Sequence, residues 1–128
     1  MTFVNKYVIH NKRARSWAIL WTLLVFFLCF IPGNDLPEVD IPFIDKWTHI
    51  VLFGVFAFLW LCAGRTRNIK YLLAILIVST YTGWLVEFVQ GHYVPNRSQD
   101  VMDMLADVCG AFLGTGLFAL LYKPITAA

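Results

Sequence analysis

The stretch DKWTHIVLFGVFAFLW, residues 45–60, begins with charged and polar side chains and continues as an almost unbroken apolar run. Three further apolar runs follow the same pattern, and together they predict four helices at about residues 16–32, 46–64, 71–90 and 104–122. A helix needs roughly 20 apolar residues to cross about 30 Å of hydrocarbon, where backbone polar groups must bond to one another. The sequence therefore predicts an all-α integral membrane bundle of four transmembrane helices, forming a single domain over residues 1–128.

The composition favours the same class. Hydrophobic residues make up 59% of the chain and charged residues only 14%, which is hard to reconcile with a soluble globular domain. Cys29, Cys62 and Cys109 each lie inside an apolar run, so we expect packing residues and no disulfide framework. No small-x-small cleavage pattern follows the first apolar run, which predicts a retained helix and not a secretory signal.

The charges separate by side of the predicted bundle. Every acidic residue flanks or enters the helices on one side, together with Lys46 and Arg97. The other eight of the ten basic residues lie on the opposite side: Lys6, Lys12, Arg13, Arg15, Arg65, Arg67, Lys70 and Lys123. The positive-inside rule then predicts a multi-pass protein of the bacterial cytoplasmic membrane with both termini inside, and the tryptophans are candidate interfacial anchors.

Three of the predicted helices carry polar residues on one face at their acidic side. These sets are Asp45 and His49; Glu87 and Gln90; and Asp100, Asp103 and Asp107. Spacings of three and four place each set on a single helix face. We therefore expect His49, Glu87 and Asp103 to line one outward-open pocket. Below it, Ala106, Gly110 and Gly114 form a small-residue stripe that predicts a close helix contact, with Gly116 beyond.

Simpler interpretations exist for several of these residues. Asp100 and Asp103 can act as caps of the last helix, and His92 is expected in a loop. His49, Glu87 and Asp107 lie deeper in apolar segments, where a charge costs at least about 2.5 kcal/mol at the membrane centre. Such residues are candidate site residues. The alternative is a purely structural polar lock, in which Lys46 and Arg97 neutralise the carboxylates.

Residues 45–60 and the stretch EFVQGHYVPNRSQDVMDMLADVCGAFLG, residues 87–114, resemble the VanZ-like family of small bacterial membrane proteins. The resemblance covers about residues 45–116, and one departure is Asp107, where the family often has Asn. It implies a link to resistance against the glycopeptide teicoplanin, but the family has no settled biochemical activity. The family residues map onto Asp45, Lys46, His49, Glu87, Gln90, Pro95, Arg97, Asp100 and Asp103.

The leading functional hypothesis is a site at the outer leaflet that binds or modifies a cell-envelope lipid or cell-wall precursor. Lys46 and Arg97 can hold phosphate or carboxylate, whereas the acidic groups can hold amines or a divalent metal ion. His49, Glu87 and Asp103 are the candidate catalytic residues. The candidate substrate-binding residues are Asp45, Lys46, Gln90, Arg97, Asp100 and Asp107.

Two alternatives stay open, namely a metal-assisted intramembrane hydrolase or transferase and a non-catalytic structural or regulatory membrane partner. Expected partners are membrane lipids, with a cell-wall precursor lipid or a glycopeptide antibiotic as further candidates, and no nucleic acid. A transporter is disfavoured because the inner halves of the helices carry no ionisable residues. The sequence leaves the oligomeric state open.

Overall fold

The computed structural model describes residues 2–125, and these residues form helices and loops with no strand. The main helices are α1 (Ala14–Cys29), α2 (Ile44–Gly64), α3 (Ile69–Tyr93) and α4 (Val101–Leu121). A short π-helix, Asn5–Ile9, precedes α1, and a 3₁₀ turn, Gly33–Asp35, follows it. The all-helical bundle that we predicted is confirmed, with every helix boundary within three residues of its predicted position.

Three of the helices, α2, α3 and α4, are long and apolar enough to cross a membrane. The fourth, α1, has 16 residues and is apolar but shorter. At 1.5 Å per residue it extends about 24 Å, somewhat less than a typical hydrocarbon core. The fold is consistent with a four-helix membrane bundle.

Local sequence signals account for the helix ends. The side chain of Asn68 accepts a hydrogen bond from the Lys70 backbone N–H and so caps α3, and the side chain of Asp100 does the same for α4 through Met102. At the end of α2, Arg65 adopts a left-handed conformation with φ of 53°, which terminates the helix.

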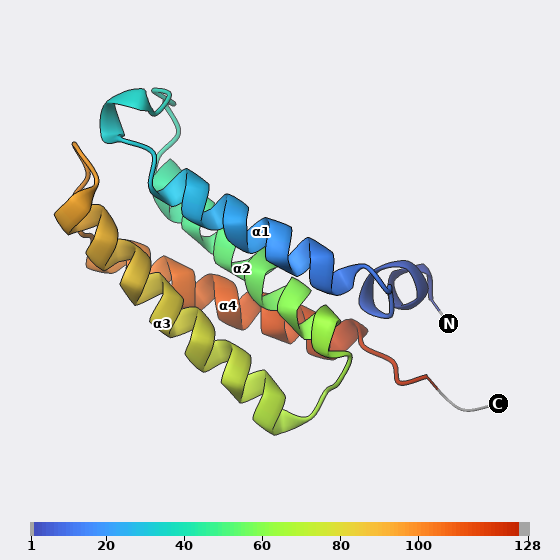
Figure 1. Ribbon diagram of the computed structural model, residues 1–128. Coiled ribbons are helices and arrows are strands. Elements are labelled where there is room, and N and C mark those ends of the chain that lie inside the picture. The colour runs from blue at the N-terminus through green and yellow to red at the C-terminus, as the bar shows by residue number, and fades with distance from the viewer. Residues whose placement is uncertain (1, 126–128) are drawn as a thin grey trace.

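Figure 1 shows both chain termini at one end of the bundle and the loops after α1 and α3 at the other. We call this second end the acidic end, because all eight acidic residues lie there. At the opposite end, the Asn5 side chain donates to the Leu121 carbonyl and accepts from the Lys123 backbone N–H, each over 2.7 Å. These two bonds fix the N-terminal segment against the end of α4.

The most extensive helix contact joins α2 and α4, and glycines make it possible. A Cβ added to Gly110 would lie 3.0 Å from the Gly54 backbone nitrogen, and one added to Gly114 would overlap the Gly54 carbonyl. The predicted close contact is therefore confirmed, and its partner is Gly54 on α2. Gly116 takes no part, since a Cβ there would meet nothing within 4 Å.

Two tryptophans form hydrogen bonds between helices. The indole N–H of Trp21 donates to the Leu52 carbonyl over 2.9 Å, and that of Trp60 donates to the Thr22 hydroxyl over 3.0 Å. Both residues therefore join α1 to α2.

The three cysteines are free, as predicted. Cys29 and Cys62 are buried, whereas Cys109 is exposed and does not pack in the core.

Candidate functional site

Ionisable side chains from three helices meet at the acidic end, as the helix-face spacings predicted. We call them the polar cluster: Asp45, Lys46, His49, Glu87, Asp100, Asp103 and Asp107. The cluster has a solvent-facing part around Lys46 and a buried part around His49. The two parts have different chemistry.

The solvent-facing part, which we call the rim, consists of Lys46 and three carboxylates. The ammonium nitrogen of Lys46 lies 2.5 Å from Asp45, 2.6 Å from Asp100 and 2.7 Å from Asp103. The contacts with Asp45 and Asp100 are hydrogen bonds, and that with Asp103 is an ion pair. The hydrogen bond from Lys46 holds the pKa of Asp100 below its usual range. Asp45 and Asp100 remain open to solvent, with side chains 55% and 37% exposed.

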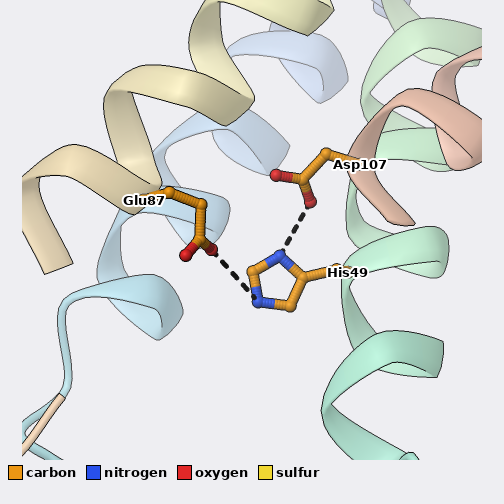
Figure 2. Close-up of side chains that lie close together, drawn as sticks. All are labelled: His49, Glu87 and Asp107. Atoms are coloured by element: carbon orange, nitrogen blue, oxygen red, sulfur yellow. Dashed lines mark hydrogen bonds and ion pairs between the residues drawn. The ribbon is translucent and has the colours of Figure 1, made fainter. Parts of the chain in front are cut away.

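The buried part, which we call the inner trio, consists of His49 from α2, Glu87 from α3 and Asp107 from α4 (Figure 2). His49 Nδ1 lies 2.7 Å from Asp107 Oδ1, and the carboxylate accepts the Nδ1–H hydrogen bond. His49 Nε2 lies 3.9 Å from Glu87 Oε1 and 3.6 Å from Asp103 Oδ2. These two separations are too long for hydrogen bonds. The imidazole is thus fixed by Asp107 and turns its second nitrogen toward two carboxylates.

Small residues make room for the inner trio. A Cβ on Gly83 would lie 2.8 Å from Asp107 Oδ2 and 3.0 Å from its Cβ, so α3 can approach Asp107 only because residue 83 is glycine. The contact of Gly54 with Gly110 similarly brings α2 and α4 together one turn below His49 and Asp107. Sequence reasoning missed Gly54 and Gly83. A signal for Gly83 was present, because it precedes Glu87 by one helical turn.

Glu87 has two different oxygen environments. Its Oε2 accepts the backbone N–H of Asp100 over 3.0 Å, which ties the end of α3 to the start of α4. Its Oε1 is buried and has no hydrogen-bond partner among the described residues. Asp107 Oδ2 is in the same state. A buried acceptor without a donor typically costs about 1–3 kcal/mol, and more when it is charged.

Two of the predicted substrate-binding residues lie outside the polar cluster. The side-chain amide of Gln90 donates to the Cys29 carbonyl over 2.5 Å, and the Arg97 guanidinium donates to the same oxygen over 3.3 Å. Both therefore hold the end of α1. Within residues 2–125, Arg97 forms no ion pair with the cluster, and Lys46 is the one lysine or arginine that pairs with its carboxylates.

The simpler interpretations are partly correct. Asp100 caps α4 through Met102, as that interpretation expected, and in addition binds Lys46 with its other oxygen. Asp103 binds Lys46 with Oδ1 and faces His49 with Oδ2, so it belongs to the cluster. His92 was expected in a loop but lies in the last turn of α3, where it is exposed.

Helices apolar enough to cross a membrane, with a buried imidazole and carboxylates at one end of the bundle, place this chain among membrane proteins that carry a polar cluster. The chain belongs to the VanZ/LLP1 family, whose model matches residues 3–122 and thus nearly the whole sequence. Membership links the protein to glycopeptide resistance in general terms. No curated protein and no solved structure matches the chain.

Proposed function

We propose that this protein binds a cell-envelope lipid or cell-wall precursor at its acidic end, on the outer side of the bacterial cytoplasmic membrane. The polar cluster is the observation that carries the proposal. It combines a solvent-facing rim with a buried histidine and carboxylates at the end of an apolar bundle, where a lipid headgroup would meet it. The positive-inside rule supports the orientation, because eight of the ten basic residues lie at the opposite end.

The charges favour an ammonium group as the part of the ligand that is bound. The rim has three carboxylates around a single lysine ammonium, which leaves an excess of negative charge. Lys46 is already paired with three carboxylates, and Arg97 donates one guanidinium N–H to the Cys29 carbonyl, outside the cluster. The charge that remains at the rim is therefore negative, which favours an ammonium group over a phosphate. An aminated lipid headgroup, or a precursor with a free amine, matches the exposed oxygens of Asp45 and Asp100.

A lipid-binding assay tests this proposal. The full chain is placed in nanodiscs that contain phosphatidylethanolamine and, in competition, the same lipid with its amine acetylated. We expect selective retention of the free amine in native mass spectrometry. Asp45→Asn and Asp100→Asn should each weaken the preference about two- to fivefold, because a charge pair at so exposed a position contributes about 0.5–1 kcal/mol.

The control is Glu38→Gln, which removes an exposed acidic group in the loop before α2. This change should leave the preference intact. Equal retention of the two lipids by the unchanged protein would refute recognition of an amine. An equal effect of Glu38→Gln would show a general charge effect and would exclude the rim as the binding site.

A metal-assisted hydrolase or transferase is a second candidate. The hydrogen bond between His49 and Asp107 favours it, because a carboxylate that fixes one imidazole nitrogen prepares the other for a metal ion or a proton. This candidate depends on the metal site inferred below. Binding of an amine at the rim does not depend on it.

A further inference from the structure

We propose that the polar cluster contains a divalent-cation site, formed by His49 Nε2, Glu87 Oε1 and Asp103 Oδ2. The ligand class is a borderline divalent ion such as Zn²⁺ or Mn²⁺. This inference goes beyond the proposed binding of an envelope amine, which uses the exposed oxygens of the rim.

Two separations measured from the imidazole are compatible with ligands of one ion. His49 Nε2 lies 3.6 Å from Asp103 Oδ2 and 3.9 Å from Glu87 Oε1. Two ligands that each lie roughly 2.0–2.2 Å from an ion, at angles near 110–120°, are about 3.4–3.8 Å apart. The observed separations are too long for hydrogen bonds and close to those of ligands around a metal ion.

The oxygen of Glu87 provides independent support. The Glu87 side chain is fully buried, and its Oε1 has no hydrogen-bond partner among residues 2–125. This oxygen points toward the imidazole (Figure 2). A cation between the two groups would give the oxygen the partner that it lacks, whereas a neutral cavity would leave a buried acceptor unsatisfied.

The outer ligand sphere also has the form expected around a metal. Histidines that bind metals usually donate their other ring N–H to a carboxylate or carbonyl, which fixes the orientation of the ring. Asp107 has this position, since it accepts from His49 Nδ1 over 2.7 Å. We therefore assign Asp107 as a positioning residue for the proposed site.

The rim does not provide a competing site. Asp45, Asp100 and Asp103 can also bring ligand oxygens within 4.8 Å of one another. The ammonium nitrogen of Lys46, however, lies within 2.7 Å of all three residues and takes the place of a cation there. One imidazole and two carboxylates favour Zn²⁺ or Mn²⁺ over Ca²⁺, which prefers six to eight oxygen ligands.

Metal binding by the purified full chain tests the inference. The protein in nanodiscs is stripped with a chelator, loaded separately with Zn²⁺ and Mn²⁺, and assayed by elemental analysis and calorimetry. We expect about one bound ion per chain and a rise in Tm on loading. Glu87→Gln and Asp103→Asn should each reduce affinity at least about tenfold, and Asp107→Asn about 10- to 100-fold, as for removed outer-sphere carboxylates.

Asp45→Asn is the matched comparison, because it removes a carboxylate from the rim and leaves the inner atoms unchanged. Affinity should stay within about twofold of the unchanged protein. Absence of binding by the unchanged protein would overturn the inference, and so would a loss in Asp45→Asn as large as that in Glu87→Gln. The Tm of each metal-free variant shows whether it is folded. The assay measures bound metal and not bound lipid, so its outcome is separate from that of the lipid experiment.

Discussion

Replacing Gly110 with alanine probes the contact on which the polar cluster rests. The added Cβ would lie 3.0 Å from the Gly54 backbone nitrogen and closer still to the Ile50 carbonyl oxygen. Ordinary contact begins at 3.4 Å, so α2 and α4 must separate by about 0.4 Å to relieve the contact with the Gly54 nitrogen and by about 1 Å to relieve that with the Ile50 carbonyl. The clashing atoms belong to the backbone of α2, and no side-chain rotation can relieve the contact.

The expected cost follows from this geometry. Extra volume in a well-packed interior typically costs about 1–3 kcal/mol, whereas alanine gains up to about 1 kcal/mol over glycine in helix propensity. We therefore expect Gly110→Ala to lower the free energy of unfolding by about 1–2 kcal/mol. The measurement is reversible unfolding in mixed micelles as the fraction of denaturing detergent increases.

The same helix provides the control. A Cβ on Gly116 would meet nothing within 4 Å, so Gly116→Ala should leave stability unchanged or raise it slightly. Equal destabilisation by the two changes would refute the reasoning, because it would attribute the loss to glycine content and not to the contact between α2 and α4.

Three further predictions address the site and its orientation. Glu87→Gln and His49→Gln should leave membrane abundance and the Tm of the metal-free protein near those of the unchanged protein but abolish any protection against teicoplanin. Loss of protection in proportion to abundance would support a purely structural cluster. In a chain without its own cysteines, an impermeant thiol reagent added to cells should label Ser98→Cys and spare Thr66→Cys, and the reverse pattern would refute the proposed orientation. The depressed pKa of Asp100 should make its ion pair stabilising above the pKa of the unfolded chain, with the contribution lost as pH falls through the lower folded value. Tm measured between pH 7 and pH 3 should therefore fall less in Asp100→Asn than in the unchanged protein.

The sequence predicted the helices well because lipid restricts the choice of structure. Long apolar runs that cross a membrane must be helical, and polar residues three or four positions apart must share a face. The meeting of His49, Glu87 and Asp103 followed from these two constraints. Their detailed roles did not, because spacing along one helix does not specify the partner on another.

The predicted roles of Gln90 and Arg97 illustrate this limit. Both residues lie near the cluster in sequence, and Gln90 shares a helix with Glu87. Their hydrogen bonds nevertheless go to the Cys29 carbonyl. The position of α1 beside α3 decides this pairing, and no periodic pattern in the sequence encodes it. The contact of Gly54 with Gly110 likewise depends on how α2 packs against α4, which the sequence of either helix alone does not specify.

The shared Cys29 carbonyl has a consequence for biogenesis. Its two donors, Gln90 and Arg97, lie 61 and 68 residues later in the chain. At about 5–20 residues per second, the ribosome needs roughly 3–12 s to reach the first donor after Cys29 has been synthesised. During that interval the end of α1 must obtain hydrogen bonds from water or from the insertion machinery. The end of α1 can therefore complete these two hydrogen bonds only after the third helix has been made.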